Sequence, residues 1–186
     1  MATRGVTRRP KKLTMAEAIQ HQRATIPVHE AGHAVLHIML GLGCEHVTIV
    51  PDEDSAGATF HEGELAEESE DMRAVAEEEF LLRHAAALYA GAEAVRQLGA
   101  KHWRVGADND YYHATDAINR ISGDPKAVDL LFKLAKRRSF LLVKHYWPEI
   151  TALANQLEKA RTLTGDQARE IVFDSLKQRG AGIATW

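Results

Sequence analysis

Residues 26–40 read Ile-Pro-Val-His-Glu-Ala-Gly-His-Ala-Val-Leu-His-Ile-Met-Leu and contain an H-E-x-x-H motif at positions 29–33. On an α-helix, residues four apart lie on one face, one turn above each other. The imidazoles of His29 and His33 can therefore bind one metal ion from the same side. Glu30 follows the first histidine directly, where its carboxylate can reach a water molecule on that metal and act as a general base.

The residues around the motif predict a helix that packs into a core. Apolar side chains recur beside the histidines at helical spacing, namely Val28, Ala31, Val35, Met39 and Leu42. Pro27 suits the first turn of such a helix, and Gly41 and Gly43 suit its end. Gly32 costs about 1 kcal/mol of helix stability relative to alanine. We therefore expect another part of the chain to approach the backbone at Gly32.

A site with two nitrogen ligands and an open position for water is typical of catalytic zinc. Such a site needs a third protein ligand. The segment that enters the helix expected at 111–121 offers Asp108, Asp110 and His113 on spacing alone, and the residue pattern does not choose among them. His37 lies about 12 Å along the helix from His29, too far to share its metal. We interpret His37 and His84 as structural histidines.

The remainder of the chain predicts a mainly α protein of the α+β class. Residues 46–50 are β-branched and alternating, and residues 58–61 can return as a second strand, so that a small hairpin or sheet lies beside the motif helix. Thr14 can cap a short helix through residue 22. Helices are further expected at 81–95, 111–121, 127–144, 148–159 and 165–176. We expect Asp108 and Asn109 to cap the second of these helices and Thr164, with Gln167, to cap the last through a capping box.

Composition limits the range of functions. The 186 residues suit one domain, expected at 14–179 between a basic, disordered tail at 1–13 and a frayed end at 180–186. The net charge of -3 argues against nucleic acid as the main partner. Cys44 is the single cysteine, which excludes an internal disulfide and favours a reducing compartment. No apolar run is long enough to span a membrane. We expect a cytoplasmic protein.

Four segments in order resemble the peptidase domain of the FtsH family of zinc proteases, the M41 peptidases. His-Glu-Ala-Gly-His-Ala-Val at 29–35 is similar to the active-site motif of that family, and residues 46–51 resemble the strand that follows it. Gly-Ala-Asp-Asn-Asp at 106–110 resembles the segment that carries the third zinc ligand. Leu-Ala-Asn-Gln-Leu-Glu-Lys at 153–159 resembles a C-terminal helical motif. The resemblance covers residues 25–176.

Carried over by position, the resemblance implies His29, His33 and Asp110 as ligands of Zn²⁺ and Glu30 as the catalytic glutamate. Two departures stand out. Residues 91–96 read Gly-Ala-Glu-Ala-Val-Arg where the family has Gly-Arg-Ala-Ala-Glu-Glu, and these 186 residues contain no P-loop of the form G-x-x-x-x-G-K-[ST]. The contacts that the family makes from its helix at 91–96 are therefore not carried over to this chain. We also do not expect this chain alone to unfold substrates with ATP.

These observations predict a zinc-dependent, ATP-independent metalloendopeptidase. Its expected substrates are flexible or unfolded polypeptides. A separate ATPase or unfoldase and a homo-oligomeric assembly are further partners that the sequence leaves open. Two alternatives remain at this point: a peptidase dedicated to one regulatory protein, and a metal-stabilised interaction module without proteolysis. The intact Glu30 argues against the module, because a structural zinc site needs no base and is usually closed by a fourth protein ligand.

Overall fold

The computed structural model of the chain describes residues 14–51, 57–60 and 70–180. Within them lie seven helices and three short strands: α1 (Met15–Met39), β1 (His46–Thr48), β2 (Ala58–Phe60), α2 (Glu70–Leu88), α3 (Ala90–Gln97), α4 (Asp108–Ile121), α5 (Pro125–His145), α6 (Trp147–Ala160), β3 (Thr162–Thr164) and α7 (Gly165–Gln178). The predicted class, mainly α with a small sheet, is confirmed. The predicted tail at 1–13 lies outside the described residues, as do residues 181–186 of the frayed end predicted at 180–186.

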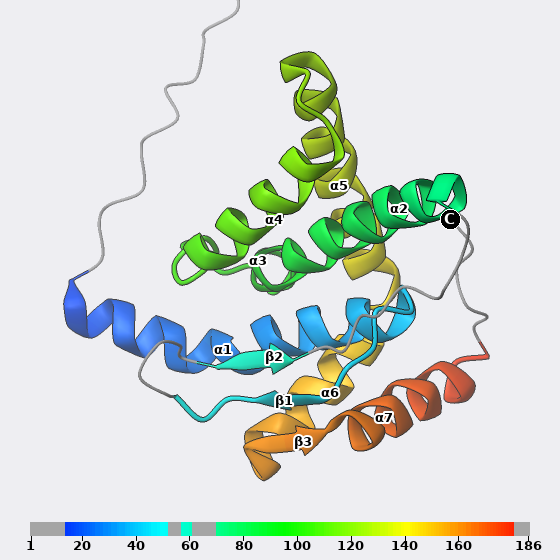
Figure 1. The fold of residues 1–186 in the computed structure, drawn as a ribbon. Coiled ribbons are helices and arrows are strands. Elements are labelled where there is room, and N and C mark those ends of the chain that lie inside the picture. Colours follow the sequence, from blue (N-terminus) through cyan, green and yellow to red (C-terminus); the bar gives the residue numbers. More distant parts are fainter. Residues whose placement is uncertain (1–13, 52–56, 61–69, 181–186) are drawn as a thin grey trace, which may run out of the picture.

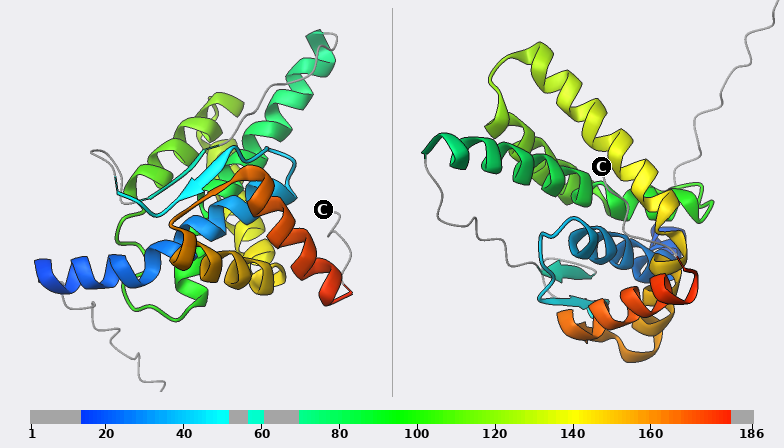
Figure 2. Two further views of the ribbon diagram at one scale, coloured as in Figure 1. Left: turned by 90° about the horizontal axis from the view of Figure 1, so that it is seen from below. Right: turned by 90° about the vertical axis from the view of Figure 1, so that its right-hand side faces the viewer.

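Helix α1 runs through the middle of the molecule. The sheet, α6 and α7 lie on one side of it, and α2, α3, α4 and α5 lie on the other (Figures 1 and 2). Its most extensive packing is with α3 and α6. The H-E-x-x-H motif therefore lies at the centre of the fold, where both halves of the molecule can contribute to a site.

The small sheet has the order β2-β1-β3, with both neighbours antiparallel to β1. Val47 at the centre of β1 pairs with Thr59 of β2 and with Leu163 of β3. The first two strands were predicted, and β1 is shorter than expected. The third was not, because three residues before a helix cap carry no alternating pattern. Within the part of the chain that the structure describes, β2 forms one edge of the sheet and contacts α1.

Helix α1 is longer than the sequence predicts. Thr14 does cap a helix, through a capping box with Glu17, but the predicted short helix and the motif helix are one element, and Pro27 lies inside it. The prediction that Pro27 opens a new helix was therefore wrong. Proline removes one helical hydrogen bond, and Pro27 is buried, so that its packing offsets part of this loss. The helix ends at Met39, before Gly41 with φ of 71°.

The predicted single helix at 81–95 is two helices. The break falls at Tyr89, between α2 and α3. Tyr89 is 1% exposed and lies in a second core cluster with Leu81, Ala114 and Ile118. Helix α3 instead packs on α1. The two helices thus pack into different core clusters. The spacing of apolar residues does not reveal this tertiary arrangement.

The remaining helices follow their local signals. The capping box of Thr164 and Gln167 opens α7, as predicted, and Pro148 lies in the first turn of α6. Asp124 caps α5 by accepting a hydrogen bond from the backbone N–H of Ala127. The predicted caps of α4 were wrong, because Asp108 is already helical and Ala107 holds the cap position. Asp108 and Asp110 instead place negative charge at the positive end of the helix dipole.

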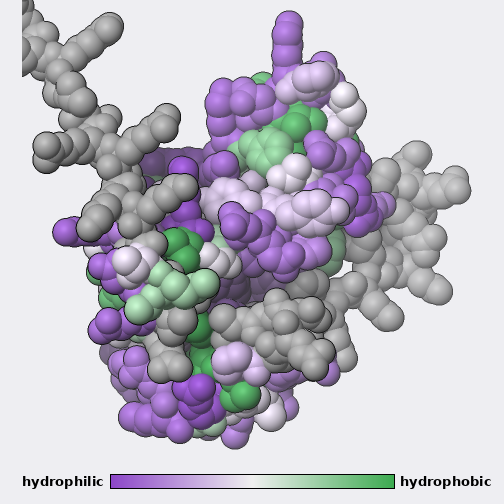
Figure 3. Space-filling model, turned by 90° about the vertical axis from the view of Figure 1, so that its left-hand side faces the viewer, coloured by the Kyte–Doolittle hydropathy of each residue, from purple (hydrophilic) through white to green (hydrophobic). Residues whose placement is uncertain are grey.

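The surface is mostly hydrophilic on the side shown in Figure 3, with small hydrophobic areas between polar ones. Among the described helices, none combines the length and the apolar character that crossing a membrane requires.

Candidate metal centre

Two histidines of α1 point to the same place. The Nε2 atoms of His29 and His33 lie 3.0 Å apart, with the rings edge to face at 4.7 Å between centroids. Their side chains are 14% and 7% exposed. The helical spacing of the motif therefore produces the pair of converging nitrogen atoms that it predicts.

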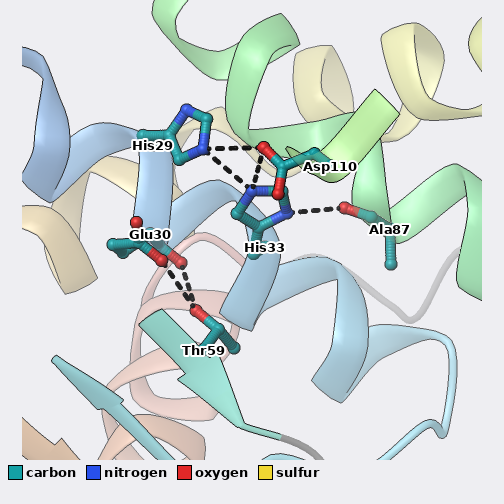
Figure 4. A network of polar contacts seen from close by, with 6 residues as sticks. All are labelled: His29, Glu30, His33, Thr59, Ala87 and Asp110. Carbon is teal, nitrogen blue, oxygen red and sulfur yellow. Dashed lines mark hydrogen bonds and ion pairs between the residues drawn. The ribbon is translucent and has the colours of Figure 1, made fainter. Parts of the chain in front are cut away.

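Helix α4 brings Asp110 to this pair. Its Oδ2 atom lies 3.0 Å from Nε2 of His29 and 3.3 Å from Nε2 of His33 (Figure 4). These three residues form a group that could hold a metal ion. Asp108 and His113, the two other candidates on spacing, are exposed and lie outside the group. The geometry thus selects the same aspartate that the family resemblance implies.

Helix α3 packs its glycine against the two imidazoles. A Cβ atom built on Gly91 would lie 2.6 Å from Nε2 of His29 and would overlap Nε2 of His33. The crossing is also close in the other direction, because a Cβ atom on Gly32 would lie 2.8 Å from the carbonyl oxygen of Ala90 and 2.9 Å from Cβ of Ala94. The expectation that the chain approaches α1 at Gly32 is confirmed. The role of Gly91 was not predicted, although a glycine inside the helix expected at 81–95 is the same signal that indicated a close approach at Gly32.

The protein also fixes the tautomer of His33. Its Nδ1 atom lies 2.9 Å from the backbone oxygen of Ala87. A carbonyl can only accept a hydrogen bond, so Nδ1 carries the proton and the lone pair of neutral His33 is on Nε2. A backbone partner of this kind is what orients histidine ligands in metal sites. In its neutral form, His33 therefore presents the Nε2 lone pair towards Asp110.

The charges of the group fit a cation at its centre. Burial alone would lower the pKa of the His33 imidazole, but the carboxylate of Asp110 outweighs this and raises the pKa to about 9. Burial would raise the pKa of Asp110, but His33 and His29 hold it well below its ordinary value. The lone pairs of the two imidazoles and the carboxylate oxygen repel one another at this distance unless a positive charge lies between them. A proton supplies that charge in part, and a metal ion can supply it to all three atoms.

Glu30 is buried beside this group and faces the sheet. Glu30 is 6% exposed. The hydroxyl of Thr59 on β2 donates to Oε2 of Glu30 and to the Glu30 backbone oxygen, both at 3.3 Å (Figure 4). A Cβ atom on Gly57 would lie 3.0 Å from Oε1 of Glu30. Burial raises the pKa of the Glu30 carboxyl, against the lowering effect of His29 and His33. The carboxylate is thus a confined base next to the candidate ligands.

Two tyrosines of α4 and the histidines interpreted as structural lie outside the ligand group. Tyr111 packs against Tyr89, with 5.1 Å between ring centroids, and Tyr112 is 69% exposed. His37 and His84 contact each other at 5.8 Å between centroids, outside the ligand group. The interpretation of His37 as too distant for the same metal agrees with this placement.

A comparison of the chain with models of known protein families and with curated protein sequences finds no match.

Proposed function

We propose that this protein is a zinc metallopeptidase that hydrolyses peptide bonds in flexible or unfolded polypeptides. The observation that carries the proposal is the group of two imidazoles and one carboxylate next to a buried glutamate. Among the described residues, the group includes no fourth histidine, cysteine or carboxylate ligand. A structural zinc site is usually closed by four protein ligands, whereas a catalytic one keeps a position open. This difference favours the peptidase over an interaction module.

His29, His33 and Asp110 would hold the zinc, because two nitrogen atoms and one carboxylate are a usual catalytic ligand set. When bound, zinc supplies Lewis-acid chemistry, polarising a carbonyl and lowering the pKa of water. The Ala87 carbonyl keeps His33 in the tautomer that this binding requires.

Glu30 is the proposed general base. Its carboxylate takes a proton from the water that attacks the carbonyl carbon, and it returns the proton to the amine as the carbon–nitrogen bond breaks. Burial favours this role, because it raises the pKa of the carboxyl and so makes the carboxylate a stronger base. The hydroxyl of Thr59 holds Oε2 in place and limits that rise.

The edge strand β2 supports an extended polypeptide as substrate. Its residue Thr59 contacts Glu30, and an edge strand can bind an extended peptide through backbone hydrogen bonds that depend little on sequence. This binding mode requires an accessible, unfolded stretch of chain. Folded substrates would need a separate unfoldase to supply such a stretch.

The proposal is tested by metal content and cleavage of unfolded casein. Wild-type protein should hold one zinc per chain, Glu30→Gln should keep the zinc and lose cleavage, and Asp110→Ala should lose both. Asp108→Ala is the matched control, because this exposed aspartate lies in the same first helical turn. Cleavage by Glu30→Gln would exclude the assigned base. Zinc retention without any cleavage by the wild type would favour the interaction module.

A further inference from the structure

Guanidinium groups and aromatic rings alternate where α3, the connection from α3 to α4, and α5 meet. The Cζ atoms of Arg104 and Arg96 lie 4.6 and 5.8 Å from the ring centroid of Trp103. Those of Arg96 and Arg137 lie 5.0 and 5.1 Å from the ring centroid of Phe140. These are cation–π distances. The five residues, which we call the arginine cluster, come from three segments of the chain, so that only the fold assembles them.

The arginine cluster carries positive charge that the described residues do not neutralise. Glu93 accepts a hydrogen bond from Nε of Arg96 at 2.8 Å and pairs with it. No ion pair between described residues involves Arg104 or Arg137, and both are exposed. This positive surface lies on a protein whose net charge is -3. Its sign is therefore a local feature and does not follow from the overall composition.

The cluster is carried by the same helices as the candidate metal centre. Gly91 of α3 lies against the imidazole of His33, and Arg96 follows it by five residues, or about 7.5 Å along the helix axis. Arg104 lies in the connection that leads directly into α4, the helix that carries Asp110. A molecule bound to the cluster is therefore held near the candidate ligands.

Lys136 extends the positive charge towards this centre. Its ammonium group lies 5.2 Å from the ring centroids of both Tyr89 and Tyr111, and Tyr111 directly follows Asp110 in α4. Lys136 is exposed and directly precedes Arg137 of the cluster. The positive surface therefore reaches the residue next to a candidate ligand.

The stacking of the cluster favours carboxylates of a polypeptide as the groups that it binds. A ring beneath a guanidinium group fixes its plane and leaves the N–H donors at its edge free to bind a carboxylate through two hydrogen bonds. Nucleic-acid bases would need free ring faces for stacking, but each ring already has two guanidinium groups over it. The connection also exposes Leu98 and Val105, at 48% and 39%, and these suit apolar side chains of a peptide.

We infer that the arginine cluster docks an acidic segment of the polypeptide substrate, away from the bond that is cleaved. This inference rests on the proposed peptidase function and adds a charge preference to it. Carboxylates of the segment bind the guanidinium edges of Arg104 and Arg137, and apolar residues between them contact Leu98 and Val105. Docking holds the substrate near the metal centre while a flexible stretch beside the acidic segment is cleaved.

The first experiment measures binding to zinc-loaded Glu30→Gln protein by fluorescence anisotropy. One labelled glycine-serine peptide contains alternating glutamate and leucine, and a second has glutamine in place of each glutamate. The glutamate peptide should bind at least about tenfold more tightly, and added salt should weaken its binding. Combining Arg104→Gln with Arg137→Gln should reduce the preference to below about twofold. The matched control combines Arg169→Gln with Lys177→Gln, which removes the same charge from exposed positions of α7.

Three results would overturn the inference. The first is equal affinity of the wild-type surface for the glutamate and glutamine peptides, a comparison that needs no change in the cluster. The second is an equal effect of the cluster variant and the α7 variant. The third is tighter binding of a single-stranded oligonucleotide of the same charge, lost in the cluster variant, which would assign the surface to nucleic acid instead.

A cleavage assay separates this inference from the peptidase proposal. The two stretches are attached to one flexible reporter peptide, and wild-type protein should show a lower KM for the glutamate version at a similar kcat, because docking adds binding that does not change during the reaction. Cleavage of both versions with equal KM would contradict the docking. Preferential binding of the glutamate peptide without any cleavage would support the docking surface and count against the peptidase proposal alone.

Discussion

Gly91 of α3 lies against the imidazole of His33 with no space for a methyl group between them. The contact is reciprocal, because Gly32 of α1 lies against the backbone of α3 at Ala90. The candidate ligands are therefore held by backbone packing on one side and by Asp110 on another. The positions of the two imidazoles depend on the absence of a side chain at a residue that is itself no ligand.

We expect Gly91→Ala to weaken zinc binding at least about tenfold, the effect usual for residues that orient metal ligands. The added methyl group must displace one or both imidazoles. The measurement is a zinc titration against a chromophoric chelator, with thermal melting to follow the fold. Gly123→Ala is the control, since a Cβ atom at Gly123 meets nothing within 4 Å. Normal zinc affinity in Gly91→Ala would show that α3 does not constrain the ligands.

Zinc binding near neutral pH should release about one proton, because His33 must lose its proton to bind metal. Asp110 raises the pKa of His33 from 6.5 to about 9 in the metal-free protein. Zinc affinity should accordingly increase with pH up to about 9. Calorimetry in buffers of different ionisation enthalpy measures the proton release directly. An observed heat that is independent of the buffer would contradict the prediction.

The same shift has a consequence for the metal-free fold. Protonated His33 stabilises the folded state fully below a pH of about 6.5, and this contribution is lost as the pH rises through about 9. Urea unfolding of chelator-treated protein at several pH values tests this. Asp110→Asn should flatten the dependence in this range, since the neutral amide no longer attracts the imidazolium.

Thr59→Val should move the acid limb of the activity profile to higher pH. The Thr59 hydroxyl stabilises the Glu30 carboxylate, so its removal raises the pKa of this proposed base. The deprotonated form that the proposed mechanism needs is then populated only at higher pH. The measurement is kcat/KM for an unfolded peptide between pH 5 and 8, together with zinc content, which should not change. Thr162→Val is the control, because its hydroxyl bonds to Thr48 on the other side of β1.

Arg179→Ala should destabilise the protein by about 3 kcal/mol, the usual cost of leaving a buried charge without its partner. Glu149 is fully buried, and Arg179 donates to both of its oxygen atoms at 2.7 and 3.1 Å. Arg169→Ala breaks an exposed pair with Asp166 and should cost less than about 1 kcal/mol. Chemical denaturation of both variants gives the comparison. Equal effects would mean that Ser175, which also donates to Glu149, suffices alone.

Local rules predicted much of this molecule from its sequence. The helix cap at Thr14, the capping box at Thr164, the strand that begins at residue 46 and the converging pair of histidines all follow from interactions within a few residues of each other. Such signals are present in the chain before it folds. This is why several element positions and the convergence of His29 and His33 could be inferred correctly.

What the sequence did not reveal depends on tertiary packing. Spacing left three candidates for the third position of the group, and only the tertiary placement of α4, which packs on α2, brings Asp110 to it. The break at Tyr89 lets α2 and α3 pack on different cores, and Pro27 remains helical where local rules predict a boundary. Gly91 contacts His33 only because α3 packs on α1, and Thr59 contacts Glu30 only because β2 lies beside α1.

The separation of His29 from Asp110 by 81 positions also determines when the centre can form during biosynthesis. At roughly 5–20 residues per second, the ribosome completes the motif at His33 about 4 to 15 seconds before it reaches Asp110. The strand that flanks β1 on its other side, β3, is made later still. The nascent chain thus carries its two histidines and its glutamate for several seconds without the third side chain of the group. The full set therefore exists only after residue 110 has been made, and the helices α5, α6 and α7 that complete the fold are still to follow.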